Sequence, residues 1–201
     1  MLKKYLRHVK ATLKSVGATF AWDTVGLALF LLFGSLAALF TILGAPMPIL
    51  SQTLNKNCLL MWGVKGNCID AGINVYVKDW QVCQTMKDFM YAGMAAGFVA
   101  VFGSVAALVL GVVMAVKRVA WPLTLPAFIV GYSAAGANIY ICYATIMFMR
   151  NDMCNTGQLQ ELGWTWGSGF CVDIVAIAFQ LLATSFLLGL PVEFSEPVDQ
   201  K

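Results

Sequence analysis

Residues 90–116 read MYAGMAAGFVAVFGSVAALVLGVVMAV, an apolar run without a single charged side chain. A helix needs about 20 such residues to cross the roughly 30 Å of hydrocarbon in a bilayer. Every backbone amide inside that layer must be bonded within the segment, and the run lacks the alternation of a barrel strand. This stretch therefore predicts a transmembrane helix.

Three further apolar runs lie at about 24–45, 121–149 and 168–190. Composition agrees with a membrane protein, because the chain is 60% hydrophobic and 11% charged, whereas soluble domains carry about 25% charged residues. Pro122 and Pro126 near the start of the third run predict a short lead-in or a kink. We predict an all-α membrane protein, a single four-helix transmembrane bundle.

The placement of basic residues predicts which ends of the helices face the cytoplasm. The basic residues of the first segment and of the second loop are Lys3, Lys4, Arg7, Lys10, Lys14, Lys117 and Arg118. Both segments then lie on the cytoplasmic side. We predict a multi-pass protein of the plasma membrane with both termini cytoplasmic, outer loops at 46–89 and 150–167, and a cytoplasmic tail at 191–201.

Residues 1–23 also have the pattern of a basic amphipathic helix. Their apolar side chains recur at helical spacing, at Leu2, Tyr5, Leu6, Val9, Leu13 and Val16. Such a helix can lie on an anionic cytoplasmic leaflet. The alternative is that the lysines serve only to fix the topology.

Five of the six cysteines lie in or beside the predicted outer loops, which indicates an oxidising compartment on that side. They are Cys58, Cys68, Cys83, Cys154 and Cys171, whereas Cys142 lies inside a span. The simplest candidate disulfides are Cys58–Cys68 and Cys154–Cys171, which leaves Cys83 over. The sequence does not fix this connectivity.

The first outer loop has strand character, because Ile73, Val75 and Val77 alternate with polar or aromatic neighbours. Residues 70–72 are suited to a turn before that strand. We predict a small antiparallel β-sheet in this loop, standing on the bundle.

Small residues recur along the second and third spans. They are Gly93, Gly97, Ala100, Ser104, Ala107 and Gly111, followed by Ala127, Gly131, Ala134 and Asn138. This spacing is typical of a seam between packed helices. We interpret it as contacts inside one bundle, with the face of a homo-oligomer as the alternative.

Polar side chains inside the spans are few. Asp173, Asn138 and Gln180 are the candidates, and an ionisable residue within a span is a functional candidate by default. The structural interpretation is that Asp173 reaches water or a partner such as Thr145 or Tyr143. The functional alternative is that the three line a transport path.

No catalytic or metal-ligating set is present in the sequence. The single histidine, His8, lies in the basic segment without a partner, and no phosphate-binding glycine loop occurs. We expect no enzyme activity, no cofactor and no metal. The formal charge of +3 is too small to favour nucleic acid. The expected partners are membrane lipids and, through the outer loops, the protein itself or other surface proteins.

The stretch 58–68, CLLMWGVKGNC, resembles the signature of the amastin family of trypanosomatid surface proteins. The matching residues are Cys58, Leu59, Trp62, Gly63, Lys65, Asn67 and Cys68. Leu60 departs, since the family prefers a hydroxyl there, and Met61 departs mildly. No Asn-x-Ser/Thr sequon occurs in the chain, so the N-glycosylation expected of a surface glycoprotein has no acceptor.

Amastins in turn resemble claudins, four-span proteins with a tryptophan and a cysteine pair on a small extracellular sheet. The chain ends in Asp199, Gln200 and Lys201, unlike claudins that finish in valine, so a tight-junction role is not implied. The resemblance implies a structural, adhesion or host-interface role at the cell surface. A small channel, transporter or accessory subunit using Asp173, Asn138 and Gln180 is the alternative. Trp62 either packs on the outer ends of the spans or contacts a partner.

Overall fold

The computed structural model describes residues 25–69, 72–79, 83–117, 123–152, 154 and 157–188. The predicted amphipathic segment at 1–23 and the predicted tail at 191–201 lie outside these residues.

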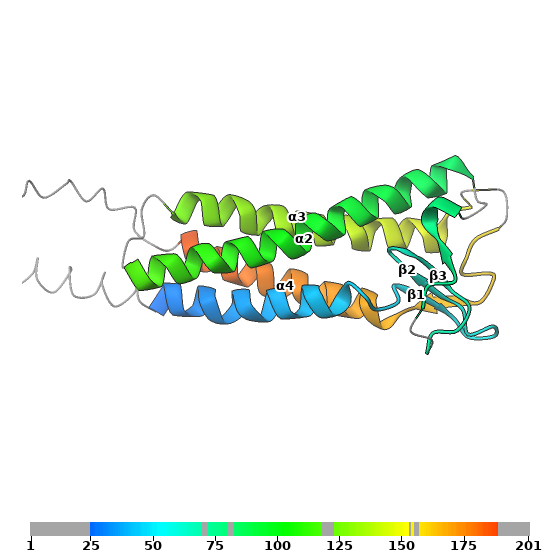
Figure 1. Cartoon of the computed structure of the whole chain (residues 1–201), viewed down its shortest axis with the longest axis horizontal. Coiled ribbons are helices and arrows are strands. Elements are labelled where there is room, and N and C mark those ends of the chain that lie inside the picture. Colours follow the sequence, from blue (N-terminus) through cyan, green and yellow to red (C-terminus); the bar gives the residue numbers. More distant parts are fainter. Residues whose placement is uncertain are drawn as a thin grey trace, which may run out of the picture.

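Four long helices run side by side and form one elongated bundle (Figure 1). They are Val25–Gly44, Gln84–Lys117 (α2), Thr124–Arg150 (α3) and Ser168–Leu188 (α4). Each is long and apolar enough to cross a membrane. The predicted four-span bundle is therefore confirmed.

Helix α2 begins at Gln84, earlier than the predicted span start at residue 90. Its first turns are polar, and the Gln84 Nε2 donates a hydrogen bond of 2.7 Å to Asp88 Oδ1, one turn further along. A helix of 34 residues is about 51 Å long at 1.5 Å per residue, well beyond the hydrocarbon thickness. Helix α2 is therefore longer than a bilayer span requires, and its polar first turns lie at the Gln84 end, the end nearer the sheet.

Helix α3 begins at Thr124, which places Pro126 in its first turn. A proline there removes only an N–H group that has no partner inside the helix. The proline thus fits the start of the helix, as the predicted lead-in requires, without a break in the span.

A five-stranded antiparallel sheet lies at one end of the bundle (Figure 1). Its strands are β1 (Leu50–Gln52), β2 (Cys58–Leu60), β3 (Gly63–Lys65), β4 (Val75–Tyr76) and β5 (Trp164–Trp166), in the order β4-β3-β2-β1-β5. The predicted sheet is present, but β5 comes from the second outer loop. The sheet therefore joins both outer loops instead of belonging to the first alone.

The strand expected around residues 73–78 is shorter than its alternation suggests. Only Val75–Tyr76 is a strand, and a 3-10 turn (η1, Val77–Asp79) follows. Val77 turns its side chain into the core, where it is 1% exposed, and its N–H donates to the carbonyl oxygen of Trp62 at 3.3 Å. Burial of Val77 therefore ends the strand.

The small-residue seams of α2 and α3 are buried within the chain, as the intrabundle interpretation predicts. A Cβ added at Gly131 would run into the Thr184 methyl group, and one added at Gly111 would run into the Phe30 ring. These glycines let neighbouring helices approach where any side chain would separate them. The seams therefore serve this bundle and are not free for a second copy.

The sheet shares a hydrophobic core with the outer ends of α2 and α3. The buried members are Ile49, Leu50, Leu59, Val77, Met86, Met90, Phe148 and Met149. Full burial of each large apolar side chain contributes about 1.5–3 kcal/mol. This shared core makes the sheet an integral cap of the bundle.

Candidate functional site: the outer sheet

The hairpin β2–β3 is the centre of the sheet and contains most of the cysteine-flanked motif. Cys58 lies opposite Lys65 and Leu60 opposite Gly63, which leaves Met61 and Trp62 as a two-residue turn. Gly63 has φ +156°, and a Cβ there would run into the carbonyl oxygen of Val75 on β4. The motif therefore requires glycine at this position because the next strand lies against its backbone.

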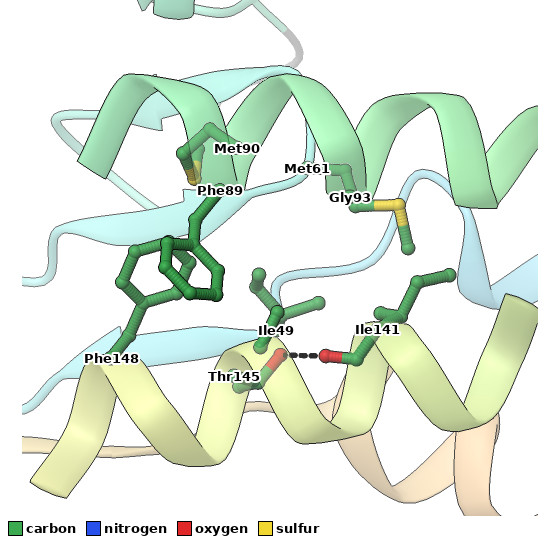
Figure 2. A pocket seen from close by; sticks show the side chains of 9 residues that line it. Ile49, Met61, Phe89, Met90, Gly93, Ile141, Thr145 and Phe148 are labelled. Carbon is green, nitrogen blue, oxygen red and sulfur yellow. Dashed lines mark hydrogen bonds between the residues drawn. The ribbon is translucent and has the colours of Figure 1, made fainter. Parts of the chain in front are cut away.

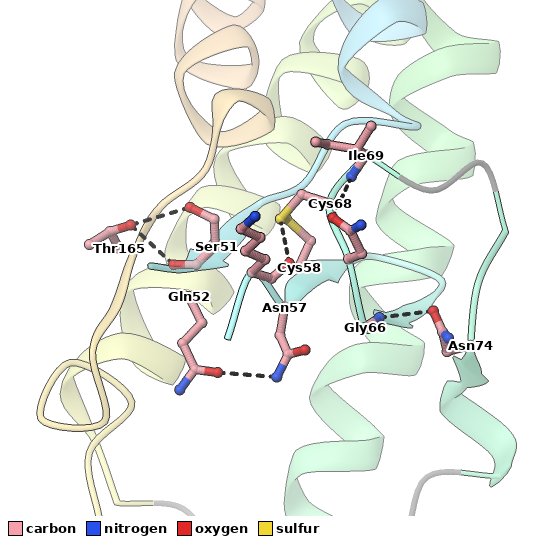
Figure 3. Close-up of a disulfide and its surroundings, with 11 residues drawn as sticks. Ser51, Gln52, Asn57, Cys58, Gly66, Cys68, Ile69, Asn74 and Thr165 are labelled. Atoms are coloured by element: carbon pink, nitrogen blue, oxygen red, sulfur yellow. Dashed lines mark hydrogen bonds between the residues drawn. A yellow bond between two sulfur atoms is a disulfide. The ribbon is translucent and has the colours of Figure 1, made fainter. Parts of the chain in front are cut away.

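A disulfide joins Cys58 to Cys68 and closes this hairpin into a small loop (Figure 3). The N–H of Cys68 also donates a hydrogen bond to the carbonyl oxygen of Lys56 at 2.9 Å. The last residue of the motif is therefore held by both a disulfide and a hydrogen bond. This is the pairing expected from the sequence. Closure of so short a loop stabilises the folded hairpin by about 3 kcal/mol on chain entropy.

Trp62 fastens the hairpin turn to the membrane-spanning helices. Its indole Nε1 donates to the carbonyl oxygen of Ala45 at 3.2 Å, and its ring meets Phe98 of α2 edge-on at 5.2 Å. The sequence left two roles open for Trp62, and the structure shows the first of them, in which the side chain packs on the outer ends of the spans. Tryptophan suits this level because it is both apolar and a hydrogen-bond donor.

The polar end of the motif orders the loop that follows β3. Asn67 Oδ1 accepts a hydrogen bond from the N–H of Ile69 at 3.3 Å. Asn74 Oδ1 accepts one from the N–H of Gly66 at 2.8 Å (Figure 3). Asn67 thus caps a local turn, and Asn74 holds the return towards β4.

The second disulfide corrects one predicted pairing, because Cys154 bonds to Cys83 and not to Cys171. Cys83 directly precedes α2 and Cys154 follows α3, whose facing ends are packed through Phe89 and Phe148 at 6.0 Å. Cys171 is an exposed free thiol in α4. Strand β5 lies between Cys154 and Cys171 in the chain and pairs with β1. This pairing leads the chain away from Cys154 before it reaches Cys171.

Several large apolar side chains of the outer loops remain exposed. Leu54 in the β1–β2 turn is 83% exposed and Ile69 after the first disulfide is 86% exposed. Leu54 lies beside the second outer loop, because its Cδ1 atom is 3.8 Å from the place of a Cβ on Gly163. The sheet thus presents apolar contact points from a rigid scaffold.

The three intramembrane polar candidates are all buried but are not bonded to one another. Asn138 Nδ2 donates to Thr41 Oγ1 at 3.4 Å, whereas Asp173 and Gln180 lie on the buried face of α4. Thr145 donates to the carbonyl oxygen of Ile141, and Tyr143 is half exposed. Neither therefore supplies the hydrogen-bond partner expected for Asp173.

A small cavity lies beneath the sheet, between α2 and α3 (Figure 2). Its lining is Ile49, Met61, Phe89, Met90, Gly93, Ile141, Ala144, Thr145 and Phe148. Its volume is about 10 Å³, which holds about one water at most. The Thr145 hydroxyl is already bonded to Ile141, so this cavity is a packing gap and no substrate pocket.

A bundle of four membrane-spanning helices with a disulfide-bonded sheet at one end defines a multi-pass membrane protein with a structured cap. The family model described as Amastin surface glycoprotein matches residues 35–187, so this chain belongs to the amastin family. A comparison with curated proteins finds no match.

Four features of the site were not predicted from the sequence. The hydrogen bonds from Trp62 to the Ala45 carbonyl and from the Gly66 N–H to Asn74 depend on how the backbone folds, which no residue pattern predicts. The Cys83–Cys154 bridge joins residues 71 apart in sequence. The aromatic pair in Trp164–Trp166 was the one available signal for β5, since aromatic residues favour strands.

Proposed function

We propose that this protein is a surface contact protein, in which the bundle is the anchor and the outer sheet is the working surface. One observation carries the proposal: both outer loops contribute to a single sheet, one disulfide closes its central hairpin, a second joins the two loops, and the loops expose Leu54 and Ile69. A rigid surface loses little conformational freedom on binding. Its role is therefore adhesion or contact at a host or neighbouring cell surface.

The same proposal places the sheet outside the plasma membrane and both termini in the cytoplasm. Disulfides persist in oxidising compartments, and both are at the sheet end of the bundle. The first helix begins, and α4 ends, at the opposite end (Figure 1). The basic residues of segment 1–23 then lie on the cytoplasmic side. In this role the protein has no catalytic step.

The test compares adhesion of cells that display the protein with and without the exposed apolar side chains. Leu54→Ser combined with Ile69→Ser should reduce adhesion several-fold, because contact through these side chains buries apolar surface. Thr53→Ser, an exposed change in the same turn, is the matched control. Labelling with a membrane-impermeant reagent confirms equal surface amounts. Unchanged adhesion of the double variant at equal surface amount would reject the proposal.

A transport-related role is the second candidate, favoured by the burial of Asp173, Asn138 and Gln180 in the bundle. Asp173→Asn should then change ion flux into vesicles while the thermal unfolding temperature stays near that of the parent protein. If flux is absent in both proteins, this candidate is rejected.

A further inference from the structure

The bundle core contains polar atoms that the described residues leave without a hydrogen bond. They are Ser104 Oγ, Asp173 Oδ2 and Gln180 Oε1, and all three lie on the long helices. Buried polar atoms in native proteins are almost always bonded to protein, to water or to an ion. Each of these atoms therefore marks a place where a small polar species is expected.

Asp173 differs from the other two because its group is a carboxylate. It is 2% exposed, and its second oxygen, Oδ1, faces Gly44, the last residue of the first helix. The place of a Cβ on Gly44 is 2.9 Å from this Oδ1 and 3.2 Å from the Val172 side chain. Only glycine leaves room for the carboxylate against the helix end.

The end of the first helix adds negative potential beside the acid. A helix C-terminus carries the equivalent of about half a negative charge on its final carbonyl groups. The described basic residues of the four helices are Lys87, Lys117 and Arg150, all near helix ends. Of the two whose side chains the structure describes, Lys87 and Arg150, neither pairs with Asp173. A buried unpaired carboxylate in such a place is costly.

The same end of the first helix also presents carbonyl oxygen atoms that can bind a cation. The Gly44 carbonyl accepts one hydrogen bond, from the Met47 N–H, and the Ala45 carbonyl accepts one from the Trp62 indole. A carbonyl oxygen has two lone pairs, so each retains one. Carboxylate and carbonyl oxygens are hard ligands, and helix C-terminal ends coordinate Na⁺ in other membrane proteins. One carboxylate balances one positive charge.

We propose that Asp173 and the C-terminal end of the first helix form an intramembrane binding site for a monovalent cation, with Na⁺ as its probe. The bound cation joins α4 to the first helix. It also supports the signature hairpin, because Trp62 bonds to Ala45, directly after Gly44. Binding does not require that the ion cross the membrane, and it is independent of contacts at the outer surface.

The test uses the full-length protein in lipid nanodiscs, with thermal unfolding followed in sodium chloride and in choline chloride of equal ionic strength. Choline is too large for a site closed by Gly44 and Val172. The unfolding temperature should rise with sodium and then saturate, since a ligand of the folded state stabilises it. Asp173→Asn, which keeps the shape of the side chain, should abolish this rise. Asp88→Asn, which removes an exposed carboxylate on α2, should leave it unchanged.

Equilibrium binding of radioactive sodium to the unmodified protein gives a second measurement that needs no variant. Saturable binding near one ion per chain supports the site, and Gly44→Ala should weaken it because the new methyl group displaces the carboxylate. No saturable binding, or an unfolding temperature that responds to sodium equally in the parent and in Asp173→Asn, would overturn the proposal. Asp173 would then be protonated or bonded to water.

Discussion

The outer sheet and the helix bundle are held together by different forces. In the sheet, backbone ladders, side-chain hydrogen bonds such as Gly66–Asn74, and two disulfides fix the chain. In the bundle, small residues let the helices pack closely, and the unbonded buried polar atoms of the described residues all lie there. Hydrogen bonds and disulfides therefore stabilise the cap, whereas close packing between helices stabilises the bundle.

The largest expected effect comes from breaking the covalent part of the cap. Cys83→Ser should lower the free energy of unfolding of the cap by about 4 kcal/mol, because the bridge to Cys154 closes a long loop. Thermal unfolding of the purified protein measures it. Cys171→Ser is the control, since this thiol is free and exposed. A larger loss in Cys171→Ser than in Cys83→Ser would contradict the observed pairing.

The next effect tests whether shape controls the bundle. Gly131→Ala should destabilise by about 1–3 kcal/mol, because the added methyl group meets Thr184 in a close-packed core. Gly136 is the matched control on the same helix, where a Cβ meets nothing within 4 Å. Gly136→Ala should stabilise by up to about 1 kcal/mol through helix propensity. Equal unfolding temperatures for both variants would refute the shape argument.

The smallest effect concerns the junction between cap and bundle. Trp62→Phe keeps the aromatic contact with Phe98 but removes the hydrogen bond to Ala45, at a cost of about 1 kcal/mol. Hydrogen exchange at the outer end of the first helix should rise with it. Trp166→Phe, an exposed tryptophan stacked on Phe170, should leave that exchange unchanged. A larger increase in hydrogen exchange in Trp166→Phe than in Trp62→Phe would show that Trp62 does not join the cap to the bundle.

The sequence predicted the bundle well because membrane spans obey one length rule and one periodicity. The seam residues from Gly93 to Gly111 are buried as their spacing requires. The sequence also predicted the Cys58–Cys68 disulfide, since the two residues are close in the chain, but it did not predict the β2–β3 hairpin that this disulfide closes. By contrast, the Cys83–Cys154 pairing and the entry of β5 into the sheet depend on which helix ends meet in space. Local patterns contain no information of that kind.

The bridge between Cys83 and Cys154 has a topological consequence. It lies at the outer ends of the two central spans, so α2, their connection and α3 form one closed covalent ring. A protease that cuts once in the connection between α2 and α3 would open the ring without releasing a fragment, and the two halves would separate only after reduction. The ring also orders biosynthesis, because it can close only once Cys154 has reached the same side of the membrane as Cys83.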